Sequence, residues 1–282
     1  MMQDLIAKSK VLIEALPYIQ KFRGATFVVK CGGSFMENQD AVRSMLQDVV
    51  FLESVSINPV LVHGGGKAIT ERMKAAGIQA RFVKGMRVTD EQSMRIVEEV
   101  LSTVLNPELV QTIQQLGGRA RGVPGKDVIR ARQLDPELGF VGDITGVDTK
   151  PLLGLLRNSI TPVISPIGRD QSDQVYNINA DVAAADVAIA LKARRLVYLS
   201  DVNGLRRNPE QEDTLIPSLR VAEVPKLIEE GVIDGGMMPK VQSAVRAIEN
   251  GVHRVHMLDG KQPHSLLLEI FTDKGVGTEI VK

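Results

Sequence analysis

The sequence predicts an α/β protein built on an open, mainly parallel sheet that is sandwiched by helices. Strand-like runs alternate with helix-periodic segments along most of the 282 residues, and this alternation is typical of parallel sheets covered on both faces. Three glycine-rich or polar stretches follow strand-like runs, at 30–33, 63–66 and 177–181. Ligands of such sheets bind outside the carboxyl ends of the strands, so we expect a ligand site there.

The composition is that of an ordinary globular protein, with 44% hydrophobic and 24% charged residues. Lys+Arg and Asp+Glu are equal at 34 each, which gives no support for nucleic acid or an anionic membrane as partner. A single cysteine, Cys31, excludes an internal disulfide framework and favours a cytoplasmic location. Charges interrupt residues 1–24 and no apolar run reaches about 18 residues, so we expect no signal peptide or membrane span.

The first half of the chain begins with an expected amphipathic helix over residues 2–22, where apolar residues recur at helical spacing. Gly77 stands at the usual helix-end position, Thr89–Gln92 has capping-box spacing, and Pro107 suits a first helical turn. The segments expected to follow are strands at 26–30 and 59–63, helices at 40–56, 68–76, from 89 to about 105 and from 106, and short strands at 119–123 and 128–132 forming a hairpin or an irregular excursion around Pro124-Gly125.

The second half continues the alternation of helices and strands. The segments expected there are a helix at 151–157, a strand at 161–165, an alanine-rich helix from 179 to about 193, a strand at 195–199, a loop at 203–214, helices at 221–230 and 238–250, a strand at 254–258 and a helix at 263–270. The organisation inferred is an N-terminal helix over 1–24, an N-terminal lobe over 25–191 and a C-terminal lobe over 192–282, divided where the second set of strands begins.

The stretch Gly64-Gly65-Gly66-Lys67 joins a predicted strand to a predicted helix. It is not a P-loop, because Leu61 and Ala68 replace the required glycine and Ser/Thr, and Ile69 excludes the dinucleotide fingerprint. What remains is an anion site made of backbone N–H groups at a helix N-terminus. A tight turn without a ligand is the alternative. Three consecutive glycines carry an entropic cost, and this cost favours the anion-site interpretation.

Three charged residues stand beside glycine-rich or polar turns. Lys30 ends a predicted strand before Gly32-Gly33, and Lys240 follows another glycine pair at a helix start. Either lysine could be simply solvated, or it could supply the positive charge that phosphate chemistry requires. Asp181 could be a first-turn acid that favours its helix dipole, or a carboxylate that orients other groups.

Other polar residues are open to more than one interpretation. Arg87 is either a surface arginine or a fork that holds a carboxylate bidentately. His63 ends a predicted buried strand and is more readily a positioned structural residue than a ligand. Cys31 is better explained as a residue that packs at the end of a strand than as a nucleophile, since no histidine partner is evident in the sequence. We expect no metal site made of protein ligands alone.

Taken together, these motifs resemble the amino-acid kinase family, and the resemblance covers essentially the whole chain. It is carried by residues 15–24, 62–66, 82–90, 177–181, 199–204, 235–241 and 266–273. The short glycine motifs are shared throughout the family. The stretches 85–90 and 177–181 are similar to those of members whose acceptor is N-acetyl-L-glutamate.

The resemblance implies ATP-dependent phosphorylation of the γ-carboxylate of N-acetyl-L-glutamate, a step towards arginine, with Mg²⁺ bound mainly by phosphates. It implies that Lys30 and Lys240 hold the transferring phosphoryl group and that Asp181 orients both lysines. The further contacts implied are backbone N–H groups of Gly32, Gly33, Gly65 and Gly66, acceptor contacts from Arg87 and Asn177, and ATP contacts from Ser200 and Asp201. An ionised acceptor needs no general base, so positioning and charge neutralisation suffice.

The resemblance also implies regulation. In arginine-sensitive members of the family an N-terminal helix interlaces dimers into a hexamer, a trimer of dimers, and Tyr18, His256, Glu269 and Gly275 match the effector pattern. We therefore expect feedback inhibition by L-arginine. The alternatives are an inactive arginine-sensing scaffold, a sister kinase with another acceptor, and a helix that only caps the core or mediates ordinary dimerisation.

Overall fold

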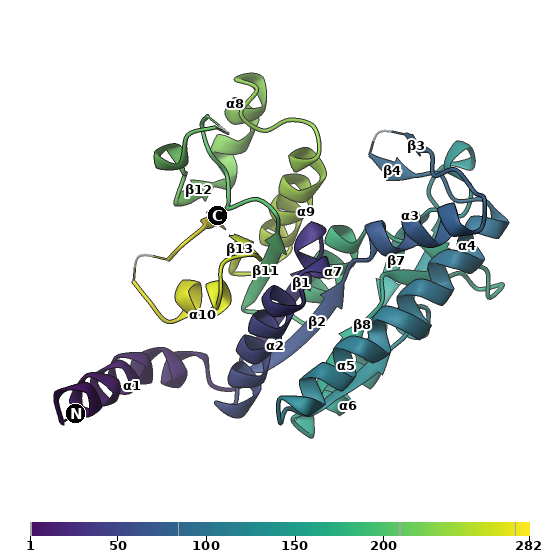
Figure 1. Cartoon of the computed structure of the whole chain (residues 1–282). Helices are drawn as coiled ribbons and strands as arrows, with labels where there is room; N and C mark the ends of the chain where they lie inside the picture. Colours follow the sequence, from purple (N-terminus) through teal and green to yellow (C-terminus); the bar gives the residue numbers. More distant parts are fainter. Residues whose placement is uncertain (1, 84, 209, 274) are drawn as a thin grey trace.

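The computed structural model describes residues 2–83, 85–208, 210–273 and 275–282 and is built around an eight-stranded sheet (Figure 1). Its strands are β1 (Thr26–Cys31), β2 (Asn58–His63), β5 (Ala120–Val123), β8 (Thr161–Ile164), β11 (Arg195–Ser200), β12 (Ser218–Arg220), β13 (Arg254–Asp259) and β14 (Thr278–Val281). Their order is β12-β14-β13-β11-β1-β2-β8-β5. Within this sheet only β13 and β14 pair antiparallel among the described residues, which confirms the predicted open, mainly parallel sheet.

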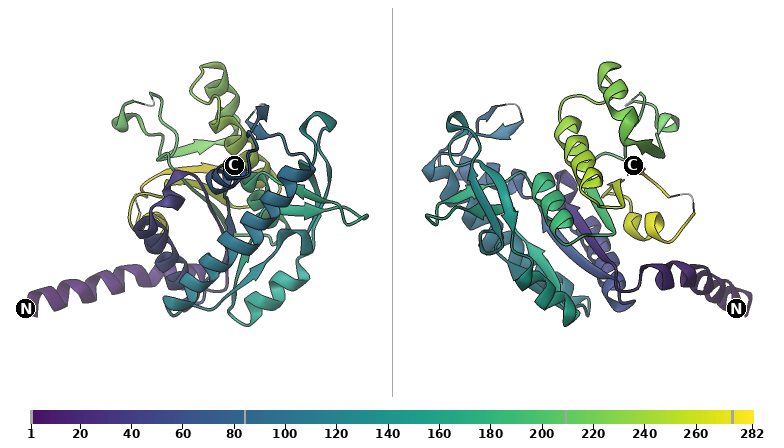
Figure 2. Two further views of the ribbon diagram at one scale, coloured as in Figure 1. Left: turned by 45° about the vertical axis from the view of Figure 1, so that its right-hand side comes forward. Right: turned by 180° about the vertical axis from the view of Figure 1, so that it is seen from behind.

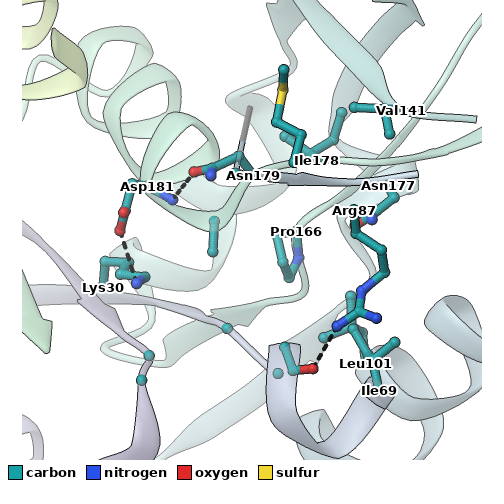
Figure 3. A pocket seen from close by; sticks show the side chains of 18 of the residues that line it. Lys30, Ile69, Arg87, Leu101, Val141, Pro166, Asn177, Ile178, Asn179 and Asp181 are labelled. Atoms are coloured by element: carbon teal, nitrogen blue, oxygen red, sulfur yellow. Dashed lines mark hydrogen bonds and ion pairs between the residues drawn. The ribbon is translucent and has the colours of Figure 1, made fainter. Parts of the chain in front are cut away.

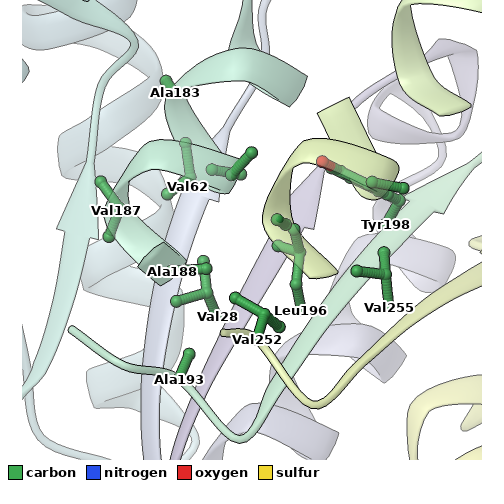
Figure 4. Packing of buried hydrophobic residues seen from close by; sticks show 14 of the residues in the cluster. Val28, Val62, Ala183, Val187, Ala188, Ala193, Leu196, Tyr198, Val252 and Val255 are labelled. Atoms are coloured by element: carbon green, nitrogen blue, oxygen red, sulfur yellow. The ribbon is translucent and has the colours of Figure 1, made fainter. Parts of the chain in front are cut away.

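Helices cover both faces of the sheet because successive strand side chains point to opposite sides. Val28 of β1 packs with the cluster under α6 (Lys150–Arg157), α7 (Ala180–Ala190), α8 (Val224–Glu229) and α9 (Met237–Glu249), part of which Figure 4 shows. Its neighbours Phe27 and Val29 pack on the opposite face, under α2 (Gln39–Ser54), α5 (Asn106–Gln115) and α10 (Ser265–Ile270). The sheet therefore lies between two apolar clusters, one on each face.

The central strands bring the predicted site residues to one edge of the sheet. Lys30 of β1 lies opposite Val62 of β2 and Tyr198 of β11 in the parallel register. The same register places Cys31 beside His63. The chain leaves both β1 and β2 at this edge through glycines, as the sequence predicts.

A smaller four-stranded sheet, in the order β10-β9-β6-β7, corrects one prediction. Its strands are β6 (Ile129–Gln133), β7 (Gly142–Val147), β9 (Ile167–Arg169) and β10 (Val175–Asn177). The predicted hairpin of 119–123 with 128–132 is wrong, because β5 pairs with β8 in the large sheet and β6 pairs with β7 in the small one. A 3₁₀ turn at Gly125–Asp127 redirects the chain between them, so the irregular excursion is what forms.

The helix predicted from Thr89 is capped one residue later, where the Asp90 side chain accepts from the Ser93 N–H at 2.7 Å. It comprises α4 (Glu91–Glu98) and a π-helical stretch, Glu99–Leu105, that runs directly into α5. Asn106 has helical backbone angles and begins α5, as the sequence predicts, without a break after the π-helical stretch. Pro107 stands in the first turn of α5, where proline is favoured, and π-helical segments such as the one before it are frequent at functional sites.

The first helix, α1 (Met2–Phe22), extends away from the body of the molecule (Figure 2). Its last turn is anchored, with Phe22 buried and in edge contact with Phe27. Val11, Leu12 and Ile13 are 63 to 69% exposed. No described helix combines the length and apolar character needed to cross a membrane.

Candidate active site

A cavity of about 230 Å³ opens at the carboxyl ends of β1 and β2. Its lining includes eight of the predicted site residues, namely Lys30, Gly32, Gly33, Gly65, Gly66, Arg87, Asn177 and Asp181. Lys30 points at Asp181 on one side of the cavity, whereas Arg87 and Asn177 lie on another (Figure 3). Sequence reasoning missed its apolar walls, which comprise Ile69, Phe82, Met86, Leu101, Val141, Pro166 and Ile178.

Two buried lysines flank one buried carboxylate: Lys30 and Asp181 line the cavity, whereas Lys240 is not among its lining residues and contacts it through Asp181. Lys30 Nζ lies 2.8 Å from Asp181 Oδ1, and Lys240 Nζ donates to Oδ2 at 2.9 Å. Asn179 fixes this carboxylate at the start of α7 by accepting the N–H groups of Asp181 and Val182. The group carries a net positive charge, and this is the environment that a phosphoryl group requires.

The charges around Asp181 determine its protonation state. Burial alone would raise the pKa of its carboxyl, but the charges of Lys30 and Lys240 outweigh burial and hold the pKa at about 2. Burial and the neighbouring Lys30 lower the pKa of Lys240. The Lys240 ammonium also lies 5.0 Å from the ring centroid of Tyr198, a cation–π contact that sequence reasoning missed.

The first glycine loop follows β1 and requires glycine for steric reasons. A Cβ on Gly32 would lie 2.6 Å from Lys30 Nζ, and Gly33 has a φ of +110° with Asp201 against it. Asp201 accepts the N–H groups of Ser34 at 2.8 Å and Phe35 at 2.9 Å. Neither Ser200 nor Asp201 is among the residues that line the cavity, and Asp201 stabilises the glycine turn instead.

The second glycine loop joins β2 to α3 (Gly66–Ala75). A Cβ on Gly65 would lie 2.6 Å from Leu101 and 2.7 Å from Leu105, so the π-helical stretch packs directly on this loop. Within the described part of the chain, the N–H groups of Gly65 and Gly66 have no hydrogen-bond partner. Free N–H groups at a helix N-terminus are suited to an anion, so the structure leaves the predicted anion site available here.

Arg87, at the end of the hairpin β3 (Phe82–Val83) and β4 (Met86–Arg87), is 7% exposed and held in place. Its Nη2 donates to the Gly66 carbonyl at 2.7 Å and to Thr70 Oγ1 at 2.6 Å, and its guanidinium lies 4.7 Å from the Phe82 ring. A bidentate grip on a carboxylate through Nη2 thus requires Arg87 to exchange one of these bonds. Asn177 donates to Thr89 Oγ1 at 3.2 Å beside it.

A second polar cavity, of about 390 Å³, brings together Tyr18, His256, Glu269 and Gly275. Glu269 lies 2.7 Å from His256 Nδ1 and accepts the N–H groups of Val276 and Gly277. Burial would raise the pKa of Glu269, but these hydrogen bonds and the His256 charge outweigh it, so the pKa is lowered. A Cβ on Gly275 would lie 2.7 Å from this carboxylate.

The wall of this second cavity adds residues that sequence reasoning missed. The Tyr18 hydroxyl, on α1, donates to the carboxylate of Asp273. The cations Lys21, Arg195 and Arg254 line the same cavity. Acidic and basic side chains therefore face the same space, which suits a ligand that carries both charges.

Comparison with known proteins places the chain in a family. The model of the amino acid kinase family matches residues 25–259. Acetylglutamate kinase of Halothermothrix orenii is 46% identical over 100% of this chain and 99% of its own length. Acetylglutamate kinase of Geotalea uraniireducens is 47% identical over 99% and 100%.

Solved structures agree with this assignment. N-acetylglutamate synthase from Neisseria gonorrhoeae, in complex with coenzyme A and N-acetyl-glutamate, has a TM-score of 0.86 at 30% identity. The match covers 97% of this chain and 63% of the synthase chain. Carbamate kinase from Giardia lamblia shares the fold, with a TM-score of 0.66 at 16% identity over 92% of this chain and 99% of its own.

The resemblance inferred from the sequence motifs is thereby confirmed. The family model covers most of the sequence, and relatives of nearly half identity align with it from end to end. This chain belongs to the amino acid kinase family.

Proposed function

We propose that this protein transfers the γ-phosphoryl group of ATP to the γ-carboxylate of N-acetyl-L-glutamate. The observation that carries the proposal is the buried Lys30–Asp181–Lys240 group beside two glycine loops that line one cavity. The name acetylglutamate kinase, borne by relatives of 46 and 47% identity, supports the choice of acceptor.

The chemistry requires two anions to meet. The acceptor carboxylate is ionised at neutral pH, so no general base is needed, and the barrier is charge repulsion and misalignment. Lys30 and Lys240 neutralise the transferring phosphoryl group, while Asp181 keeps both ammonium groups in place. The N–H groups of Gly65 and Gly66 bind the developing negative charge.

The acceptor binds between the glycine loop and the β3–β4 hairpin. Arg87 attracts its α-carboxylate, and Asn177 donates a hydrogen bond to the same molecule. Ile69, Leu101 and Val141 form an apolar wall against which an acetyl methyl group is shielded from water.

ATP binds with Mg²⁺, which neutralises phosphate charge when bound. Among the described residues no group of three or more His, Cys, Asp or Glu side chains is arranged to hold a metal, and Mg²⁺ is usually held mainly by phosphates and water. We assign acceptor binding to the lobe 25–191 and ATP binding to the lobe 192–282. Gly32 and Gly33 bind phosphate directly, whereas Ser200 and Asp201 act at the start of the ATP-binding segment.

We also propose inhibition by L-arginine in a cytoplasmic hexamer, a trimer of dimers. Glu269 and the cations of the second cavity suit an effector with a guanidinium and a carboxylate. The segment 1–24 contributes Tyr18 to that cavity, and its exposed Val11, Leu12 and Ile13 require a partner surface. Arginine bound there biases subunit geometry as a linked equilibrium.

An inactive arginine-sensing scaffold would have no need for three buried charged groups in contact. Lys30 and Lys240 are 7 and 8% exposed, and the Asp181 side chain is 14% exposed. Burying charged groups costs desolvation free energy that their attraction often does not repay, so their presence favours a catalytic role over a scaffold. An assay of turnover with different acceptors distinguishes the proposed activity from that of a sister kinase with another acceptor.

The test measures ATP-dependent ADP release with N-acetyl-L-glutamate, glutamate, aspartate and carbamate as separate acceptors. We expect turnover to depend on N-acetyl-L-glutamate. Turnover only with an unacetylated acceptor would assign a sister activity, and absence of turnover with every acceptor would favour the scaffold.

A further inference from the structure

We propose that His63 and Asn106 are positioning residues that orient the Gly64–Gly65 peptide, so that the Gly65 N–H faces the cavity. The inference rests on the proposed function, in which that N–H binds the reacting anion. His63 ends β2 and is fully buried beneath the glycine loop, and Asn106 begins α5 and is 4% exposed.

The contacts form one chain of hydrogen bonds between two carbonyl groups. Asn106 Nδ2 donates to the Val163 carbonyl of β8 at 2.8 Å and lies 3.2 Å from His63 Nε2. His63 Nδ1 lies 2.9 Å from the Gly64 carbonyl oxygen.

The two carbonyl groups determine where the protons lie. A carbonyl oxygen only accepts, so the Asn106 atom at Val163 must be its amide nitrogen, and the ring atom at Gly64 must be a protonated Nδ1. Nε2 then accepts from Asn106. Burial lowers the pKa of His63 to about 4, so the ring is neutral near pH 7 and holds this single tautomer.

The geometry of the peptide links the position of the Gly64 carbonyl to the direction of the Gly65 N–H. The Gly64–Gly65 peptide is trans, so its C=O and N–H point in opposite directions. With the Gly64 oxygen held toward the buried His63 ring, the Gly65 N–H points away from the ring, toward the open side on which Gly65 lines the cavity. The preceding N–H, on Gly64, is bound to the Cys31 carbonyl at 2.6 Å. The Gly64 N–H is therefore held by β1, while the Gly65 N–H, which has no partner among the described residues, stays free for a ligand.

The surrounding chain leaves room for this arrangement. A Cβ on Gly122 of β5 would collide with Asn106 Oδ1. Glycine at this position therefore leaves space for the Asn106 side-chain amide. The π-helical stretch Glu99–Leu105, which precedes Asn106, also places Leu105 against Gly65. Both ring nitrogens of His63 are occupied and the ring is inaccessible, which excludes it as a general base in this arrangement.

The test compares three variants. His63→Leu removes the bond to the Gly64 carbonyl, His63→Asn keeps an N–H donor near the Nδ1 position, and Val60→Ala perturbs the same buried strand without touching the loop. We expect His63→Leu to lower kcat by about 10- to 100-fold, because a misdirected donor loses part of the roughly 10²–10³ that such a donor contributes. His63→Asn should retain most of kcat, and KM for ATP should change little.

Two measurements do not depend on turnover. In ¹⁵N spectra of the wild type at pH 7, the His63 signal, identified by its loss in His63→Asn, should show a protonated Nδ1 and a bare Nε2. A crystal structure of His63→Leu should show the Gly64–Gly65 peptide turned.

A protonated Nε2, an unturned peptide with wild-type kcat in folded His63→Leu, or equal loss of kcat in His63→Asn and His63→Leu would overturn the inference. Failure of the wild type to phosphorylate N-acetyl-L-glutamate would overturn the proposed function instead, while the tautomer and peptide measurements still decide the role of His63.

Discussion

The two polar cavities of this molecule are each built around a buried carboxylate, and they differ in what surrounds it. Asp181 contacts two lysines and lies at the ends of the central strands, whereas Glu269 contacts one histidine and two backbone N–H groups at the base of α1. The first cavity has an excess of positive charge, and the second exposes charges of both signs.

In the proposed function, this difference assigns catalysis to the first cavity and regulation to the second. An excess of positive charge on rigid strands and helix ends suits an anion whose charge grows during reaction. A mixed cavity beside a projecting helix suits a zwitterionic ligand whose binding alters subunit geometry. Changes in the first cavity should therefore affect kcat, and changes in the second should affect inhibition alone.

The largest effect is expected from Lys30→Ala and Lys240→Ala. Each should lower kcat by about 10²–10³ with a much smaller change in substrate binding, because the ammonium charge matters most in the transition state. Steady-state kinetics measure this, with Lys226→Ala as control, since Lys226 is an exposed lysine of α8. Near-wild-type kcat in either variant would remove that lysine from the catalytic role.

Arg87→Ala should act on binding within the same cavity. Loss of a hydrogen bond to a charged group costs about 1.5–3 kcal/mol, so KM for the acceptor should rise roughly 10- to 100-fold with a smaller change in kcat. Arg95→Ala, which removes an exposed arginine of α4 paired with Glu91, provides the matched control. An unchanged acceptor KM would exclude Arg87 from acceptor binding.

Changes in the second cavity should leave turnover intact. Glu269→Gln removes the charge that faces a guanidinium and should raise the arginine concentration for half-inhibition by about tenfold. Deletion of residues 2–16 keeps the anchored Tyr18 and Phe22 and should convert hexamers into dimers with a weaker arginine response. Light scattering and inhibition curves on one preparation measure both effects. If the intact protein is a dimer that ignores millimolar arginine, the regulatory proposal fails and the kinase proposal stands.

The smallest effect concerns a third buried carboxylate, Asp48 of α2, which contacts His264 Nδ1 at 2.6 Å beside α10. Burial raises its pKa to about 6 despite the histidine, whereas two lysines hold the pKa of Asp181 at about 2. Because the folded-state pKa of Asp48 exceeds its unfolded value, its contribution to stability is present below about pH 4 and lost as pH rises through 6.

Asp48→Asn should remove the loss of stability that the ionisation of Asp48 causes as pH rises. The free energy of unfolding, from urea titrations at pH 4.5 and 6.5, should fall less with rising pH in Asp48→Asn than in the wild type. Parallel pH dependence in the two proteins would contradict the assignment of a raised pKa to Asp48.

Much of the catalytic cavity could be predicted because its residues follow strand ends. Lys30 and the two glycine loops follow β1 and β2, parallel strands of one sheet whose carboxyl ends lie side by side. Asp181 reaches the same place from the start of α7, after β10 of the smaller sheet, which pairs antiparallel with β9, so strand order alone does not predict its position. The helical spacing of apolar residues at 40–56 likewise predicts α2.

The remainder depends on contacts that carry no local pattern. The two-residue strands of the β3–β4 hairpin are too short to show alternation, and π-helical bonding at Glu99–Leu105 leaves no distinct periodicity. The Arg87 bonds to Gly66 and Thr70 and the Tyr198 ring beside Lys240 join distant segments. The pairing of β5 with β8 rather than β6 was decided by the tertiary structure in the same way.

The most direct test of the central claim identifies the bond that forms. The protein is incubated with MgATP, N-acetyl-L-glutamate and hydroxylamine, and mass spectrometry locates the trapped hydroxamate. We predict an enzyme- and ATP-dependent γ-hydroxamate of N-acetyl-L-glutamate, matched mole for mole by ADP. Formation of ADP without this hydroxamate, or of hydroxamate only from an unacetylated acceptor, would contradict the account.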